Sequence, residues 1–212
     1  MIESFKKVFV LAPHTDDGEL GAGGTIHKLI NSGCEVYYFA FSTAEKSVPV
    51  GFPKDILKRE LLLATKEIGI SSENVFTYNY EVRKLNYHRQ EILEDLIANK
   101  NKLKPDLVFI PSLNDVHQDH STIAKEGLRA FKDSTILGYE LIWNNLNFNT
   151  CSYSTLSNEN LEAKISAINN YQSQLHKPYM NPEFIRAHAI TRGVQFGVKY
   201  AESFEVLRWK LD

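Results

Sequence analysis

Two short segments combine histidine and aspartate in a way that could bind a metal ion and move a proton. The segment HTDD occupies residues 14–17, directly after an apolar run, and the segment HQDH occupies residues 117–120. Imidazole together with carboxylate suits zinc, and a catalytic zinc needs three protein ligands and an open position. Two ligands from one segment and one from the other would meet this need. A remaining carboxylate could then accept a proton from water.

The strands and helices that must position these segments alternate along the chain. Apolar and aromatic runs predict strands at 6–13, 35–43, 74–78, 106–112 and 135–143. Amphipathic patterns predict helices at 25–33, 55–69, 88–103 and 121–131. Such alternation is typical of βαβ units in a parallel sheet. Ligands bind beyond the carboxyl ends of parallel strands, and both histidine segments follow predicted strands.

The pattern changes after residue 143. A polar, strand-like stretch at 144–157 precedes a predicted helix at 161–175 and a predicted strand at 202–210. A length of 212 residues suits one domain. We therefore expect a single domain over 1–212, with a core at 1–143 and a C-terminal cap or extension at 144–212 packed on it.

Composition restricts the partners of this protein. The formal net charge is −2, which implies no broad basic face and argues against nucleic acid as a partner. The N-terminus lacks the long apolar region of a signal peptide, and no apolar run approaches the ~20 residues that span a bilayer. We expect a soluble, cytoplasmic protein that acts on a small molecule. The sequence is compatible with a homo-oligomer and does not set the oligomeric state.

Three glycines, Gly21, Gly23 and Gly24, lie between the first histidine segment and the first predicted helix. We expect them to form a tight loop in which the backbone comes close to the sheet or to a ligand. A phosphate-binding loop is the alternative. However, the segment GAGGT lacks both the Lys-Ser/Thr pair of a Walker motif and the full G-x-G-x-x-G spacing.

Five segments, in the same order along the chain, resemble the LmbE-like, or PIG-L-type, deacetylases. They are PHTDDGELGAGGT at 13–25, KRELLLATKEIGI at 58–70, HQDH at 117–120, KISAINNYQSQ at 164–174 and YAESF at 200–204. Two positions depart from the usual pattern of that family, because Thr15 stands where proline is usual and Gly18 where glutamate is usual. Neither position is a metal ligand in the family.

The resemblance implies a fold, an activity and a set of metal ligands. The fold would be α/β, a Rossmann-like three-layer sandwich with a mostly parallel sheet. The activity would be zinc-dependent removal of the acetyl group from an N-acetylated amino sugar or sugar conjugate. The metal ligands would be His14, Asp17 and His120. The same ligands could hold Fe²⁺, Mn²⁺ or Co²⁺.

The resemblance also implies catalytic roles. Asp16 would be the general base, and His117 would stabilise the tetrahedral intermediate or protonate the leaving amine. Asp119 would orient an adjacent histidine without binding the metal itself. From the charges alone, we expect Asp119 or Asp115 to raise the pKa of His117 and keep it an imidazolium near neutral pH.

Two arginines are candidates for substrate binding. Arg59 matches the Arg-Glu helix of the family and could hold a carboxylate or phosphate as a bidentate fork. Arg192 precedes Gly193 near the C-terminus and is assigned to the same pocket.

Two other functions stay open on sequence grounds. One is a Rossmann-type nucleotide- or phosphate-binding module whose acidic residues hold magnesium. The other is a metal-dependent amidase or esterase of the same fold with a different substrate. A magnesium–phosphate site seldom needs two histidine-bearing loops, so the sequence favours the deacetylase.

Overall fold

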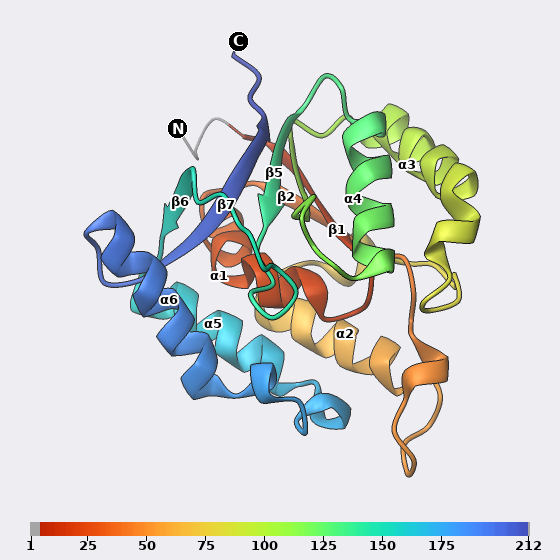
Figure 1. Cartoon of the computed structure of the whole chain (residues 1–212), viewed down its shortest axis with the longest axis horizontal. Coiled ribbons are helices and arrows are strands. Elements are labelled where there is room, and N and C mark those ends of the chain that lie inside the picture. Colours follow the sequence, from red (N-terminus) through yellow and green to blue (C-terminus); the bar gives the residue numbers. More distant parts are fainter. Residues whose placement is uncertain (1–4, 212) are drawn as a thin grey trace.

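The computed structural model describes residues 5–211, in which one 7-stranded sheet lies between two layers of helices (Figure 1). The strands are β1 Lys7–Ala12, β2 Glu35–Ala40, β3 Val75–Thr77, β4 Leu107–Pro111, β5 Thr135–Tyr139, β6 Ser152–Thr155 and β7 Ala201–Arg208. The α-helices are α1 Asp17–Asn31, α2 Ile56–Glu67, α3 Arg89–Leu103, α4 Gln118–Ala130, α5 Asn158–Asn169 and α6 Pro182–Phe196. Short 3₁₀ turns are η2 Glu45–Ser47, η3 Ser72–Asn74, η4 Leu85–His88, η5 Gln172–Gln174 and η6 Pro178–Met180.

The strand order is β3-β2-β1-β4-β5-β7-β6. Strands β3, β2, β1, β4 and β5 are parallel, while β7 runs antiparallel to both β5 and β6. The expected α/β sandwich with a mostly parallel sheet is therefore confirmed. The segment after residue 143 contributes β6 and β7 to the sheet, so it extends the sheet as well as covering it.

Strand β1 shows why the sheet needs a helix layer on each side. Val8 and Val10 pack with residues of α1, α2, α5 and α6, whereas Phe9 and Leu11 pack with residues of α3 and α4. All four side chains are fully buried. A strand that is covered on both faces reads as a continuous apolar run rather than an alternating one.

Helix α1 corrects the prediction for the glycine segment. The helix was expected at 25–33, but it starts at Asp17, so the three glycines lie inside it and form no loop. They allow a close approach of helix and sheet. A Cβ at Gly21 would lie 2.3 Å from the ring of Tyr139. Tertiary packing here outweighs the low helix propensity of glycine.

The C-terminal helices also differ from the prediction. The expected helix at 161–175 is α5, which ends at Asn169. Helix α6 is absent from the sequence-based prediction, although its start carries a signal. The side chain of Asn181 accepts a hydrogen bond from the backbone N of Glu183 at 2.7 Å, and Pro182 takes the first helical position. Within residues 5–211, no helix combines the length and apolar character needed to cross a membrane.

The sheet order brings the two histidine segments together. Residues 14–17 follow β1 and residues 117–120 follow β4, and these two strands are direct neighbours in parallel register. Parallel neighbours end at the same edge of the sheet. The loops after β2, β3 and β5 reach this edge too, and the turns η5 and η6 approach it from below α1 (Figure 1).

Candidate metal centre

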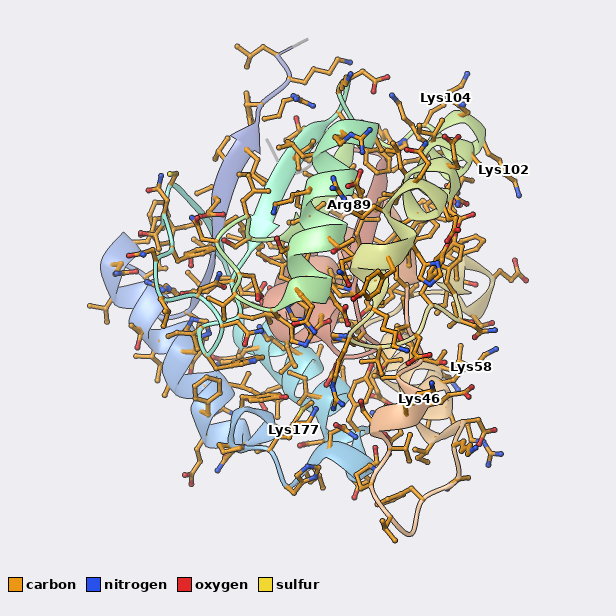
Figure 2. All side chains as sticks on the ribbon, turned by 45° about the vertical axis from the view of Figure 1, so that its right-hand side comes forward. Lys46, Lys58, Arg89, Lys102, Lys104 and Lys177 are labelled. Carbon is orange, nitrogen blue, oxygen red and sulfur yellow. The ribbon has the colours of Figure 1, made fainter. Side chains whose placement is uncertain are left out.

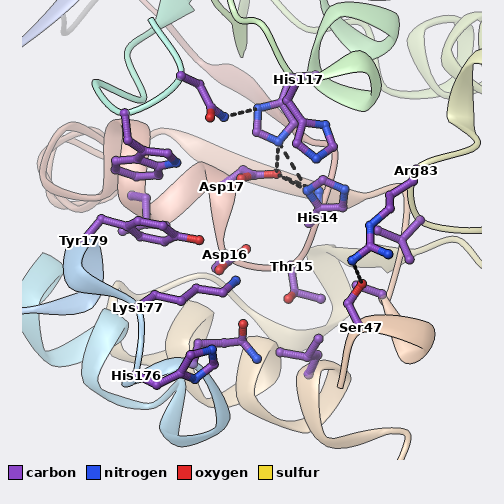
Figure 3. A pocket seen from close by; sticks show the side chains of 18 residues that line it. His14, Thr15, Asp16, Asp17, Ser47, Arg83, His117, His176, Lys177 and Tyr179 are labelled. Atoms are coloured by element: carbon purple, nitrogen blue, oxygen red, sulfur yellow. Dashed lines mark hydrogen bonds and ion pairs between the residues drawn. The ribbon is translucent and has the colours of Figure 1, made fainter. Parts of the chain in front are cut away.

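Three side-chain atoms converge at this edge of the sheet (Figure 3). His14 Nδ1 lies 3.1 Å from Asp17 Oδ2, His120 Nε2 lies 3.3 Å from the same oxygen, and the two nitrogens are 3.2 Å apart. A tetrahedral zinc ion with bonds of about 2.0–2.1 Å would hold its ligand atoms roughly 3.3–3.4 Å apart. This ligand triangle, His14, Asp17 and His120, therefore has the size that a zinc ion requires.

Two carboxylates outside the ligand triangle fix the orientation of its histidines. His14 Nε2 is 3.0 Å from Asp119 Oδ2, and His120 Nδ1 is 2.7 Å from Asp115 Oδ2. The outer nitrogen of each ring can donate its proton to its carboxylate, which orients the ring. The inward nitrogens both face Asp17 Oδ2, at 3.1 and 3.3 Å. Two imidazole nitrogens and one carboxylate oxygen that converge in this way could hold a metal ion.

The charges in the ligand triangle point the same way. Burial opposes a charge on His14, but Asp17 and Asp119 outweigh burial and raise its pKa to about 10. Burial also opposes ionisation of Asp17, but His120 and His14 hold the pKa of that carboxyl well below its usual range. The raised pKa of His14 reflects the two carboxylates beside it, and the lowered pKa of Asp17 reflects the two histidines beside it. A divalent metal ion held by these groups would take the place of the protons on the inward nitrogens.

Asp16 lies beside the ligand triangle and faces the pocket. Its residue is only 7% exposed, and Figure 3 shows its carboxylate between Asp17 and the amine of Lys177. Burial raises the pKa of Asp16, the charge of Asp17 raises it further, and the charge of Lys177 lowers it. A buried carboxylate with a raised pKa and no place among the metal ligands is suited to proton transfer.

His117 is close to the ligand triangle, since His14, His117 and His120 each offer a ring nitrogen within 4.8 Å of the others. However, Nδ1 of His117 accepts a hydrogen bond from the backbone N of Asp119 at 3.1 Å and so caps α4. The expected imidazolium is therefore wrong. Burial lowers the pKa of His117 to about 4, and the neighbouring histidines add to this effect more than the nearby carboxylates oppose it. A neutral His117 keeps one proton, on Nε2.

A buried network supports the first histidine segment from behind. Glu19 is fully buried and contacts the hydroxyl of Tyr38 and, at 2.8 Å, that of Tyr171. Both hydroxyls also lie within hydrogen-bond distance of the Thr15 carbonyl, at 3.0 and 2.6 Å. Burial raises the pKa of Glu19 to about 8. A Cβ at position 18 would lie 2.6 Å from Tyr38, so Gly18 leaves the room that the Tyr38 ring occupies.

A cavity of about 330 Å³ opens in front of the metal centre. Residues of α1, α2 and α4 and of several loops line it, namely His14, Thr15, Asp16, Asp17, Leu20, Ala44, Ser47, Leu57, Val82, Arg83, His117, His120, Trp143, Asn144, Gln174, His176, Lys177 and Tyr179. Trp143 and Tyr179 stack with ring centroids 4.0 Å apart. The size and the polar lining suit a small polar molecule.

Comparison with known protein families decides the classification. A family model described as PIG-L, GlcNAc-PI de-N-acetylase, matches residues 9–131, which is more than half of the chain. The chain belongs to the PIG-L family. The resemblance seen in the sequence is thereby confirmed, and the matched region contains both histidine segments.

Named relatives of this PIG-L protein include deacetylases. A diacetylchitobiose deacetylase of Thermococcus kodakarensis is 27% identical over 136 residues, which cover 59% of this chain and 49% of that protein. The chain thus spans about half the length of this curated relative. Among solved structures, the N,N'-diacetylchitobiose deacetylase of Pyrococcus horikoshii has a TM-score of 0.79 and 22% identity, covering 97% of this chain and 85% of that one. The conserved protein TT1542 of Thermus thermophilus has a TM-score of 0.81 and 24% identity, with coverage of 97% and 96%. Both structural similarities show the fold.

Two arginines assigned to the substrate from the sequence do not line the cavity of this PIG-L protein. Arg59 is exposed and pairs with Asp55 at 2.7 Å, one helical turn away. Arg192 forms an ion pair with Glu140 and a further hydrogen bond to Gln195. Neither side chain is among the residues that line the cavity, so their roles in substrate binding stay predictions.

Two other cationic residues line the cavity, and the sequence analysis missed them. Arg83 and Lys177 both line the cavity, from the loop after β3 and from the turn before η6. Arg83 could have been found, because any loop that follows a parallel strand reaches the same edge of the sheet. Lys177 gave no such signal, because it follows the predicted helix at 161–175 and not a predicted parallel strand.

Proposed function

We propose that this chain removes the acetyl group from an N-acetylated amino sugar or sugar conjugate by metal-assisted hydrolysis. The observation that carries the proposal is the ligand triangle, with donor atoms 3.1–3.3 Å apart, beside the buried carboxylate of Asp16. Membership of the PIG-L family and the deacetylases among its relatives support this class of substrate. We propose zinc as the metal, because two imidazoles and one carboxylate with an open position are its usual catalytic set.

The metal ion and Asp16 would have different roles in the reaction. A zinc ion held by the ligand triangle would polarise the amide carbonyl and make a water molecule acidic near neutral pH. Asp16 accepts the proton of the attacking water as the new C–O bond forms. Asp16 then delivers that proton to the amide nitrogen as the C–N bond breaks, which yields acetate and the free amine. The raised pKa of Asp16 suits a group that must first take up a proton and then release it.

His117 contributes a hydrogen bond rather than a charge. Its Nδ1 accepts the backbone N–H of Asp119, which holds the ring in one orientation. The proton on Nε2 can then be donated to the oxygen that becomes negative in the tetrahedral intermediate. Preorganised donors of this kind typically contribute 10²–10³-fold in rate. Proton delivery to the amine therefore falls to Asp16 and not to His117.

The two other functions raised by the sequence are less well supported. A phosphate-binding loop needs free backbone N–H groups, but the glycine segment is helical, and the N–H groups of Gly24 and Thr25 are bonded to Glu202 at 3.1 and 2.7 Å. An amidase or esterase with another substrate could use the same machinery. No feature of the described residues favours that substrate over an amino sugar.

The proposal is tested by purifying the protein, measuring bound metal by plasma emission spectrometry, and following release of acetate and free amine from a panel of N-acetyl sugars. We expect about one metal ion per chain and loss of turnover on chelation, with recovery on adding Zn²⁺. The same reconstitution with Fe²⁺, Mn²⁺ and Co²⁺ identifies the best metal. Asp16→Asn serves as the matched variant, since it should keep the metal but lose about 10²–10⁴-fold in rate. Full turnover by this variant, or turnover without metal, would contradict the proposal.

A further inference from the structure

Arg83 is a cationic residue of the cavity whose side chain has no anionic partner among the described residues. We propose that Arg83 binds an anionic group, a carboxylate or a phosphate, on the same sugar whose N-acetyl group is cleaved at the metal centre. This inference rests on the proposed function and names the substrate class more closely: an acidic conjugate or derivative of an N-acetyl amino sugar.

The backbone of Arg83 is fixed relative to the metal ligands. Its φ angle is +70°, a left-handed conformation that a non-glycine residue adopts only when its surroundings impose it. The backbone N of Arg83 donates a hydrogen bond to Asp119 Oδ2 at 2.6 Å, and the same oxygen lies 3.0 Å from His14 Nε2. The Asp119 carboxylate therefore contacts both His14 and the backbone of Arg83. This link fixes the backbone of Arg83 beside the reacting group, and its exposed side chain lines the cavity.

The charges around the cavity single out Arg83. Within residues 5–211, no carboxylate oxygen lies within 4.0 Å of its guanidinium, whose recorded partner is Ser47 Oγ at 3.4 Å. The neighbouring lysines differ, because Lys46 and Lys84 both pair with Glu81, at 2.7 and 2.8 Å. Lys177 lies at the same end of the molecule as Lys46 and faces Asp16 (Figures 2 and 3).

The position of Arg83 fits recognition of one end of a ligand. Figure 3 shows Arg83 and Ser47 on one side of the cavity and Tyr179 and Lys177 on the other, with His14 and Asp17 between them. A guanidinium presents parallel N–H donors that match the oxygens of a carboxylate or phosphate. A sugar with its acetamide at the metal centre could then direct an acidic substituent to Arg83.

The test compares four substrates with the zinc-loaded enzyme: N-acetylglucosamine as its methyl glycoside, its carboxymethyl glycoside, its 1-phosphate and its 6-phosphate. We expect kcat/KM to be at least 10-fold higher for one of the acidic sugars than for the neutral glycoside. Arg83→Gln should lower kcat/KM for that acidic sugar by about 10–100-fold, which is the usual contribution of a hydrogen bond to a charged group. Turnover of the neutral glycoside should change less than 3-fold, and Arg83→Lys should restore part of the loss.

Lys84→Gln is the matched control, because Lys84 is the adjacent exposed cation and does not line the cavity. It should leave all four substrates unchanged. Equal losses by Arg83→Gln on neutral and acidic sugars, or no acidic preference in the wild type, would overturn the inference while deacetylation stands.

Titration calorimetry with the same sugars decides the case in which none is hydrolysed. Failure of all turnover refutes the proposed function, whereas unchanged binding of the acidic sugars by Arg83→Gln refutes the anion site. A preference for the phosphates or for the carboxylate identifies which anion is bound.

Discussion

The protonation of single side chains decides what the metal centre can do. The outer nitrogens of His14 and His120 face Asp119 and Asp115, which leaves the inner nitrogen of each ring for the metal ion that we propose. Asp17 joins them because it is the first residue of α1, where the helix N-terminus favours a negative charge. The residue types of this centre were readable in the sequence, since both segments are short and local. The charge of His117 was not, because it depends on burial and on a backbone N–H that only the folded loop supplies.

The ligand assignment stays a prediction until it is tested by metal content. We expect Asp17→Ala or His120→Ala to lose most of the bound metal and activity together, because a three-ligand site with one ligand missing binds weakly. His117→Ala is the control, and it should keep the metal while losing about 10²–10³-fold in kcat. Emission spectrometry on protein purified in parallel gives the metal content. Loss of metal by His117→Ala, with retention by Asp17→Ala, would replace Asp17 with His117 in the ligand set.

The pH dependence of the reaction should report on Asp16. Catalysis requires the ionised carboxylate, so kcat/KM should fall as the pH drops through the pKa of Asp16. The positive charge of Lys177 favours the ionised form and lowers this pKa. Lys177→Met removes that charge, so the acidic limb of the profile should move to higher pH. The control Lys58→Met alters an exposed lysine that does not line the cavity and should leave the limb in place. An unmoved limb in Lys177→Met would mean that a group other than Asp16 titrates there.

Among the elements, α1 shows how tertiary packing can make a helix of a segment that its sequence predicts to be a loop. Glycine-rich segments usually predict loops, because glycine weakens a helix by about 1 kcal/mol relative to alanine. In α1 the glycines instead let the helix lie directly on the sheet and on α5. Residues of β5 and α5 that surround them are distant in sequence, so no local pattern could reveal the contact. Most other elements were predicted correctly, because their apolar periodicity arises within a single element.

Two neighbouring glycines of α1 provide a matched test of this packing. Gly21→Ala should destabilise the protein by about 1–3 kcal/mol, because the new Cβ would lie 2.3 Å from the buried ring of Tyr139. Gly23→Ala should cost less than Gly21→Ala, since its Cβ would meet Lys164 Cγ at 3.1 Å, a contact that a shift of a few tenths of an ångström relieves, and alanine favours the helix. Urea unfolding of both variants measures the difference. Equal midpoints for the two would show that Tyr139 can move away at little cost.

Across the whole molecule, the metal centre joins parts of the chain that are far apart in sequence. His14 follows β1, Asp17 begins α1 and His120 lies in the first turn of α4, while the cavity wall opposite them comes from residues 174–179. A cation held by His14, Asp17 and His120 would therefore bind only when the sheet is formed and these segments have met. The family resemblance predicted this assembly from motif order, whereas the contacts of Arg83 and Lys177 required the folded chain.

Removing the metal should consequently lower the stability of the entire fold. A ligand that binds only the folded state stabilises it by RT ln(1 + [L]/Kd), which is about 2.7 kcal/mol at a free concentration 100 times Kd. We expect chelation to lower the thermal midpoint, and added Zn²⁺ to restore it in a concentration-dependent manner, as followed by calorimetry. His120→Ala should unfold at one temperature whether or not chelator is present, because it lacks a ligand. If chelation left the wild-type midpoint unchanged while removing the metal, binding would not be coupled to the folded arrangement of β1 and β4.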